Sequence, residues 1–188
     1  MIPRPETELI VENALEILRE LENPRFCEVG VGSGCISISI LHELENVSAI
    51  GLDISENALE IARKNAETHG VEKRFELKKS NVFDNLKTEK FELIVSNPPY
   101  ISSEEMTNLQ TEVRKFEPWT ALTDGKDGLS IIKKIIADAP ESLNSRGFLL
   151  MEIGFTQADK VSKMFDRTLW QTLEIIPDLQ GILRTVKA

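Results

Sequence analysis

A glycine-rich stretch, Glu28-Val29-Gly30-Val31-Gly32-Ser33-Gly34, lies between two apolar segments of the sequence. The segment before it, Phe26 to Val29, is short and predicts a strand, whereas the segment after it, Cys35 to Leu44, predicts a helix. Glycine has no Cβ, so the backbone turns tightly here and a ligand can approach it closely. A strand, a glycine turn and a helix in this order predict the start of a parallel α/β sheet.

Apolar runs and helical patterns alternate along the rest of the chain. We expect further strands at Val47–Leu52, Phe75–Lys79, Phe91–Ser96 and Phe148–Ile153, and helices at Glu6–Leu21, Ser55–His69, Leu129–Leu143 and Gln157–Phe165. Two last strands, Leu169–Ile176 and Ile182–Val186, have only the turn Pro177–Gly181 between them, so we expect an antiparallel hairpin. The pattern predicts one α/β domain over residues 1–188, with a doubly wound, mostly parallel seven-stranded sheet that ends in this hairpin. Such sheets bind ligands beyond the carboxyl ends of their strands, where the strand order reverses.

Composition and charge narrow the class of protein. The 188 residues are 41% hydrophobic and 28% charged, and no apolar run approaches the length of about 20 residues that a membrane span needs. Cys27 and Cys35 are the two cysteines, which favours small packed side chains in a reducing cytoplasm over a metal or redox pair. The net charge of −9 argues against a nucleic-acid partner, and we interpret the basic cluster at Lys73, Arg74, Lys78 and Lys79 as solvated surface. We expect no metal site and no membrane contact.

The glycine loop and an acidic residue predict a cofactor site. Gly30, Gly32 and Gly34 follow the first strand, and Asp53 ends the second strand, where a carboxylate can accept hydrogen bonds from a ribose diol. A dinucleotide fingerprint requires a third glycine at the position of Cys35, so the loop favours S-adenosylmethionine over NAD. Glu28 then lies near the methionine ammonium of the cofactor, or it orients the glycine loop. The simpler alternative for the glycines is a tight turn without a ligand.

The fourth strand ends in Asn97-Pro98-Pro99-Tyr100, which predicts a site for a planar nitrogen. The Asn97 side-chain oxygen and the Pro98 carbonyl can accept both hydrogens of an amide or aromatic amine, which favours a more nucleophilic geometry. Pro99 stiffens the turn, and Tyr100 offers a flat face to the target group. Asn97, Pro98 and Tyr100 are therefore the candidate catalytic residues, and no strong general base is required. The alternative is an ordinary proline-rich turn with an aromatic plug.

Taken together, these motifs resemble the HemK/PrmC family of glutamine N5-methyltransferases, which modify peptide chain release factors. The similarity extends over nearly the whole chain. The segments that carry it are Ile2–Glu8, the glycine loop, Asp53-Ile54-Ser55, Ser96–Ile101, Glu117-Pro118 with Ala121-Leu122, Asp127-Gly128-Leu129, Glu152-Ile153-Gly154 with Gln157, and Asp178 with Gly181 and Arg184. The resemblance implies a Rossmann-like class I methyltransferase that uses S-adenosylmethionine and releases S-adenosylhomocysteine. Its acceptor would be the glutamine of a Gly-Gly-Gln motif.

The resemblance also implies roles for residues outside the two motifs. The segment Arg4 to Glu8 would pack over the active site, with Thr7 near the cofactor or the Asn-Pro-Pro-Tyr motif. Ile54 and Val82 would line the cofactor, although Val82 and Phe83 are also candidates for the core. Asn81 would contact adenine in place of the aspartate that is common in the family. Glu117 would contact the protein substrate.

Three further points stay open on the sequence alone. Bacterial members of the family have a small helical N-terminal domain, and we expect it to be absent here because Met1 directly precedes the Ile2-Pro3-Arg4 segment. The long loop from Ile101 to Lys126 is either a lid that contacts the substrate or an irregular connector. A nucleic-acid adenine or guanine amino-group methyltransferase and an inactive cofactor-binding module are the alternative functions.

Overall fold

The central element of the fold is a seven-stranded sheet in the order β3-β2-β1-β4-β5-β7-β6. The computed structural model describes residues 5–86, 88–108 and 118–188. The strands are β1 (Arg25–Val29), β2 (Ser48–Asp53), β3 (Phe75–Lys79), β4 (Phe91–Ser96), β5 (Leu143–Glu152), β6 (Glu174–Pro177) and β7 (Leu183–Lys187). Strands β1 to β5 pair in parallel, and β7 pairs antiparallel with both β5 and β6. The predicted doubly wound sheet and its C-terminal hairpin are confirmed.

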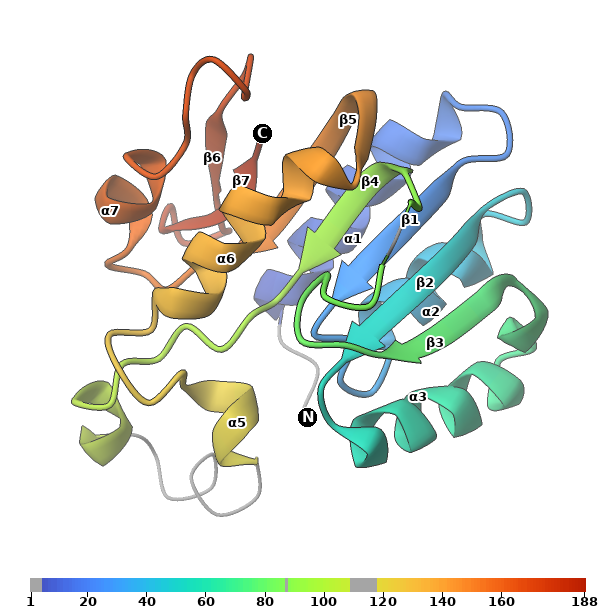
Figure 1. Cartoon of the computed structure of the whole chain (residues 1–188), viewed down its shortest axis with the longest axis horizontal. Helices are drawn as coiled ribbons and strands as arrows, with labels where there is room; N and C mark the ends of the chain where they lie inside the picture. The colour runs from blue at the N-terminus through green and yellow to red at the C-terminus, as the bar shows by residue number, and fades with distance from the viewer. Residues whose placement is uncertain (1–4, 87, 109–117) are drawn as a thin grey trace.

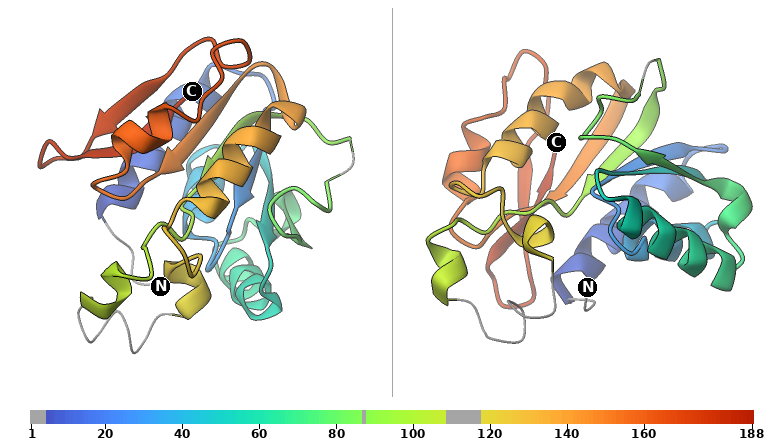
Figure 2. Two further views of the ribbon diagram at one scale, coloured as in Figure 1. Left: turned by 60° about the vertical axis from the view of Figure 1, so that its left-hand side comes forward. Right: turned by 60° about the horizontal axis from the view of Figure 1, so that its bottom comes forward.

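Helices cover both faces of this sheet, as Figures 1 and 2 show. Helices α1 (Pro5–Arg19), α2 (Cys35–Glu43) and α3 (Glu56–Thr68) share one apolar core with the sheet, and α6 (Ser130–Asp138) and α7 (Ala158–Ser162) share the other. Neighbouring residues of a strand alternate between these cores, so that Leu93 faces the first and Ile94 the second. The remaining short elements are α5 (Trp119–Leu122) and the 3-10 turns η1 (Glu72–Arg74), η2 (Glu105–Asn108) and η3 (Ala139–Glu141).

The ends of α3 confirm the signals that predicted them. The Ser55 hydroxyl accepts a hydrogen bond of 3.3 Å from the Ala58 backbone N–H, as an N-cap side chain does. At the other end Gly70 has φ +69°, a left-handed conformation that glycine adopts without the steric cost of a Cβ. The N-cap of α3, Ser55, therefore lies two residues after Asp53, so that β2 fixes the chain before this carboxylate and α3 fixes the chain after it.

The region between α6 and β5 differs from the prediction. The helix expected to reach Leu143 ends at Asp138, and a 3-10 turn that contains Pro140 follows it. Strand β5 then begins at Leu143, five positions before the expected Phe148, because Leu143 pairs with Phe91 of β4. The pairing shifts register between Phe91 and Leu93, and this irregularity interrupts the alternating pattern that reveals a strand in sequence.

The C-terminal elements are shorter than expected. Helix α7 covers Ala158–Ser162 rather than Gln157–Phe165, and β6 begins at Glu174 rather than Leu169. Phe165 and Trp170 are both buried and pack edge to face, with ring centroids 5.3 Å apart. The backbone N–H of Trp170 donates to the Asp166 carbonyl, so this segment forms a turn. Phe165 and Trp170 thus fill the core from a turn, which composition alone does not distinguish from a strand or a helix.

Two residues of the basic cluster after α3, Arg74 and Lys78, form hydrogen bonds and ion pairs within the protein. Arg74 donates to the carbonyls of Leu41, Leu44 and Val47 at 2.6, 2.9 and 2.8 Å, which caps the end of α2. Lys78 lies 2.7 Å from Glu89 and 3.2 Å from Glu76. The expected solvated surface therefore describes Lys73 and Lys79, whereas Arg74 and Lys78 are partly buried in hydrogen bonds. In the described ranges, no helix is long and apolar enough to cross a bilayer.

Replacing Arg74 tests whether this cap stabilises the fold. Arg74→Ala leaves three backbone carbonyls near the end of α2 without their charged donor. We expect the free energy of unfolding to fall by about 2 kcal/mol, as for the loss of charged hydrogen bonds. Lys73→Ala, at an exposed neighbouring position, is the matched control and should change it by less than about 0.5 kcal/mol. Urea unfolding measures both values, and equal losses in the two variants would contradict the role of the cap.

Candidate active site

The predicted site residues meet at one edge of the sheet, because parallel strands end on the same side. The glycine loop follows β1, Asp53 ends β2 and Asn97 follows β4. The arrowheads of these strands point toward the N-terminal end of α1 in Figure 1. The strand order reverses between β1 and β4, since β2 and β3 lie on one side of β1 and β4 and β5 on the other. This is the place where doubly wound sheets bind ligands.

The glycine loop is held against the end of β2 by backbone hydrogen bonds. The N–H groups of Gly30 and Val31 both donate to the Leu52 carbonyl, at 2.8 and 2.9 Å. Gly30, Gly32 and Gly34 have φ values of 76°, 55° and 80°, in the left-handed region where side chains are disfavoured. The Asn65 side chain on α3 also donates to the Ser33 carbonyl at 2.9 Å. The loop is therefore a fixed, tightly turned backbone rather than a loose connection.

Asp53 joins the glycine loop to the start of α3. Its Oδ2 accepts from the Gly32 N–H and its Oδ1 from the Ser55 N–H, both at 2.9 Å. Each carboxylate oxygen can accept a second hydrogen bond, so these contacts are compatible with a bound diol. The next residue, Ile54, is 62% exposed, which is unusual for a large apolar side chain and leaves it available to a flat ligand. Asp53 and Ile54 fit a nucleoside.

Glu28 is buried beneath the loop, with 2% of its surface exposed. Its Oε2 accepts hydrogen bonds from the Ser37 backbone N–H, at 3.0 Å, and from the Ser37 hydroxyl. Burial, together with the charge of Asp53, raises the pKa of Glu28 to about 8 against the opposing effect of the Ser37 hydrogen bonds. These contacts support the expectation that Glu28 orients the glycine loop through the start of α2. A contact with a cofactor ammonium stays a prediction.

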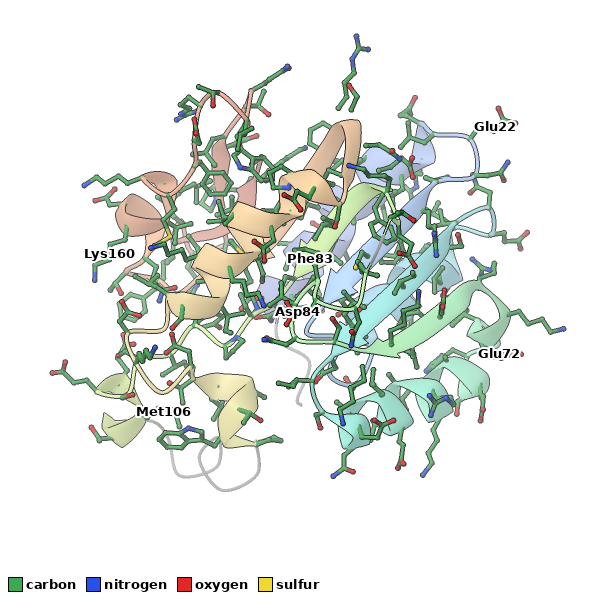
Figure 3. The ribbon with its side chains drawn as sticks, viewed as in Figure 1. Glu22, Glu72, Phe83, Asp84, Met106 and Lys160 are labelled. Atoms are coloured by element: carbon green, nitrogen blue, oxygen red, sulfur yellow. The ribbon has the colours of Figure 1, made fainter. Side chains whose placement is uncertain are left out.

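The segment after β3 contains a strained residue at the same edge. Val82 has φ +54°, which is rare for a β-branched side chain and is typical of functional sites. Val82 and Phe83 are buried in the core, whereas the Asn81 side chain is exposed. Lys134 of α6 donates to the Asn81 carbonyl at 3.3 Å and pairs with Asp84 at 2.7 Å. Figure 3 shows Phe83 and Asp84 beside α6. Asn81 is thus held by its backbone, with its amide directed outward.

The Asn-Pro-Pro-Tyr motif converges on Glu152, a residue that we did not expect in the site. The Asn97 amide nitrogen donates to Glu152 Oε2 at 2.8 Å, and the Tyr100 hydroxyl donates to Oε1 at 2.9 Å. The Thr7 hydroxyl of α1 donates to Oε2 at 3.2 Å and accepts from Asn97 at 3.3 Å. Thr7 therefore contacts the motif rather than the glycine loop. The feature of the sequence that could have indicated Glu152 as a site residue is its position as an acidic residue at the end of the fifth strand.

A second group of residues fixes the backbone that follows the motif. The Gln157 amide donates to the carbonyls of Tyr100 and Gly128, at 2.8 and 3.4 Å, and its oxygen accepts from the Gly154 N–H at 2.9 Å. Asp124 accepts from the N–H groups of Lys126, Gly128 and Ser130. Against the effect of partial burial, these hydrogen bonds and the Ser130 hydroxyl lower the pKa of Asp124 to about 2. The contact between Gln157 and Tyr100 joins residues 57 positions apart and has no local signal in the sequence.

The loop after the motif is partly ordered around this group. Ile101 forms a parallel bridge with Thr123, and the Ser103 N–H donates to the Lys126 carbonyl at 2.8 Å. Met106 on η2 is buried, and Figure 3 labels it at the lower left of the molecule. Trp119 of α5 is 56% exposed. Glu117 and Arg4 lie outside the described residues, and their predicted roles stay predictions.

The sheet order and the helices on both of its faces are those of a class I S-adenosylmethionine-dependent methyltransferase. A family model described as the methyltransferase small domain matches residues 7–115, so the chain belongs to that family. The chain is 42% identical over 189 residues to a release factor glutamine methyltransferase of Fusobacterium nucleatum, which covers 100% of this chain and 53% of the relative. A protein of the same name from Geobacter sulfurreducens is 41% identical over 186 residues, with 99% and 64% covered. The chain therefore spans between half and two thirds of the length of these relatives.

Solved structures agree with this class. A release factor-specific protein-(glutamine-N5) methyltransferase from Alicyclobacillus acidocaldarius is 29% identical, with a TM-score of 0.60 over 99% of this chain and 92% of that chain. An RNA methyltransferase from Salinibacter ruber, solved with S-adenosylhomocysteine, has a TM-score of 0.61 at 18% identity, over 100% of this chain and 90% of that chain. The second likeness concerns the fold alone.

The contact between Gly128 and Tyr100 provides a test of the group around Gln157. Gly128 has φ +75°, and a Cβ built there lies 2.1 Å from the Tyr100 carbonyl oxygen. We expect Gly128→Ala to lower the free energy of unfolding by about 3 kcal/mol, from backbone strain and displacement of the motif. Gly125→Ala is the matched control, because Gly125 has the same φ and nothing within 4 Å of its Cβ position. Gly125→Ala should lower the free energy of unfolding by only about 1 kcal/mol. Denaturant unfolding of both variants decides, and indistinguishable losses would refute the close contact.

The raised pKa of Glu28 predicts a dependence of stability on pH. The folded protein retains a proton on Glu28 between the ordinary pKa of 4.5 and about 8. Its contribution to stability is complete below pH 4.5 and is lost as the pH rises through about 8. Glu28→Gln keeps an oxygen acceptor for Ser37 without the charge, so the variant should gain about 1 kcal/mol over the wild type per pH unit in this window. Unfolding curves at pH 5, 6, 7 and 8 measure the difference, and a constant difference would contradict it.

Proposed function

We propose that this chain transfers a methyl group from S-adenosylmethionine to the side-chain amide nitrogen of the glutamine in the Gly-Gly-Gln motif of peptide chain release factors. The observation that carries this proposal is the position of Asn97 and Pro98 next to the glycine loop. Val29 and Ser96 are register partners in β1 and β4, and the Ser96 hydroxyl donates to the Val29 carbonyl at 2.7 Å. The nitrogen-binding motif and the cofactor loop therefore start side by side.

The residues at the edge of the sheet fit this cofactor. Gly30, Gly32 and Gly34 present a turned backbone without side chains, and the Asp53 oxygens retain lone pairs for a ribose diol. Ile54, Asn81 and Val82 would enclose the adenine, and the carboxyl group of Glu28 beneath the loop would accept a hydrogen bond from the methionine ammonium. When bound, the cofactor supplies a methyl group that is activated by its sulfonium charge. The Asn-Pro-Pro-Tyr motif after β4 and Glu152 at the end of β5 lie on the other side of β1, where an acceptor would enter.

The motif residues would act by positioning and by electrostatics. The Asn97 Oδ1 and the Pro98 carbonyl each accept one N–H of the acceptor amide, which holds its nitrogen in line and opposes its planarity. Pro99 limits the motion of the turn, and the Tyr100 ring covers the flat amide. As the new C–N bond forms, the nitrogen becomes acidic and releases one proton to solvent or to a nearby carboxylate. These roles require no strong base.

The relatives support the protein acceptor. The two curated relatives and the structure from Alicyclobacillus acidocaldarius carry names that specify release factors or glutamine N5 transfer. The acidic balance of 31 Asp and Glu to 22 Lys and Arg disfavours a phosphate backbone as the partner. The Lys78 and Arg74 side chains are also engaged within the protein. A release factor is therefore a better candidate than RNA or DNA.

Methyl transfer from labelled cofactor to release factor, with RNA and DNA in parallel, tests the proposal. We expect label in the Gly-Gly-Gln peptide of the release factor. Asn97→Ala should lower transfer at least about 100-fold, because the amide nitrogen loses one acceptor, and should leave the cofactor Kd within about 3-fold. Asp53→Ala should instead weaken cofactor binding itself. Label in nucleic acid alone, or cofactor binding without any transfer to release factor, would overturn the proposal.

A further inference from the structure

Glu152 is a buried carboxylate on β5 that contacts two distant parts of the chain, α1 and the Asn-Pro-Pro-Tyr motif. It is the last residue of β5 and only 1% of its surface is exposed. Thr7 on α1, Asn97 after β4 and Tyr100 at the end of the motif donate hydrogen bonds to it at distances from 2.8 to 3.2 Å. A buried charge is costly unless it is matched by donors, so such a cluster is stable in one arrangement.

This arrangement fixes which end of the Asn97 amide faces the acceptor. An ionised carboxylate only accepts hydrogen bonds, so the NH₂ end of Asn97 is turned toward Glu152 Oε2. The Thr7 hydroxyl closes a ring with the same two groups, because it accepts from Asn97 and donates to Glu152. A flipped amide would place Oδ1 against the carboxylate in a buried position, with two acceptors in contact. The Asn97 oxygen is therefore left pointing away from Glu152.

We propose that Glu152 is a positioning residue that sets the orientation of the Asn97 amide and thereby the preference of the site for an NH₂ group. This inference rests on the proposed function. An oxygen at Asn97 accepts from the amide of glutamine, whereas an NH₂ group there would instead suit a carboxylate such as that of glutamate. The selection of a nitrogen acceptor thus depends on a residue that is buried behind the motif.

The charge of Glu152 contributes in addition to its shape. A hydrogen bond from the Asn97 NH₂ to a carboxylate draws electron density toward Oδ1, which strengthens it as an acceptor for the substrate N–H. The other oxygen of Glu152 holds the Tyr100 hydroxyl at 2.9 Å. One carboxylate therefore orients both the acceptor oxygen and the aromatic ring.

Glu152→Gln tests the inference with little change in shape. Its oxygen can accept from Asn97, while its NH₂ group can donate to the Tyr100 hydroxyl, so the cluster keeps its contacts but loses its charge and its single orientation. We expect kcat for the release factor to fall about 100-fold, while the cofactor Kd and the unfolding midpoint stay near the wild-type values. Glu174→Gln, at an exposed position on β6, is the matched control and should leave kcat unchanged. A kcat within about 3-fold of the wild type, or a loss of cofactor affinity equal to the loss of kcat, would overturn the inference.

Thr7→Val keeps the inference testable if Glu152→Gln does not fold. It removes only the hydroxyl that links Asn97 to Glu152, so we expect a fall in kcat of about 3- to 10-fold with an unchanged cofactor Kd. An unchanged kcat would count against Glu152 as a positioning residue. Weaker cofactor binding instead would place Thr7 at the cofactor and would also overturn the inference.

The side-chain amide signal of Asn97 in NMR separates this inference from the proposed function. The signal is assigned by its loss in Asn97→Asp. In the wild type its NH₂ protons should exchange slowly, and Glu152→Gln should speed their exchange at least about 10-fold, because a charge-assisted bond is lost. If the wild type does not methylate release factor yet shows this change, the proposed function fails and the orientation stands. If the wild type methylates and neither the signal nor kcat changes, the orientation fails and the function stands.

Discussion

The parallel pairing of β1 with β4 is the constraint on which the site depends. It places Val29 opposite Ser96, and the Ser96 hydroxyl bonds the Val29 carbonyl where both strands end. The glycine loop and Asn97 then leave the sheet as neighbours, although 67 residues separate Val29 from Ser96 in the chain. The strand order reverses at this pair, which is the position where doubly wound sheets bind ligands. A slip of one residue in this register would turn Ser96 to the other face and separate the two motifs.

Acidic side chains organise this edge by accepting backbone and side-chain hydrogen bonds. Asp53 binds the glycine loop to the start of α3, Glu28 binds the start of α2, and Asp124 binds the turn that meets Tyr100. Glu152 does the same for the motif with side-chain donors. Orphan N–H groups at turns and helix starts are the natural partners of carboxylates, since both are costly to bury alone. Much of the negative charge near the site therefore serves to hold its loops in place.

The sheet was largely predictable because its central strands are short apolar runs bounded by turn residues. β3 and β4 begin and end as predicted, and Ser55 and Gly70 bound α3 as expected. The wrong predictions have local causes. The irregular register near Phe91 interrupts the pattern at the start of β5. The buried pair of Phe165 and Trp170 has the apolar composition of a helix or a strand although it lies in a turn. The positions of the glycine loop, Asp53 and Asn97 follow from strand order. The contacts of Glu152 and Gln157 with the motif do not, because these partners lie 55 and 57 positions away in the chain. Thr7, the other partner of Glu152, lies 145 positions away.

The sequence by itself determined the class of the fold and the chemistry that its motifs can perform, because glycine freedom, proline stiffness and amide hydrogen bonding are properties of single residues and their neighbours. The tertiary structure alone decided how those groups are oriented. Asn97 has the same amide in any fold, but only the carboxyl end of β5 brings Glu152 to its NH₂ group. Thr7 likewise reaches the motif only because α1 packs across β4 and β5. Orientation requires contacts between distant segments, and these exist only once the sheet has formed.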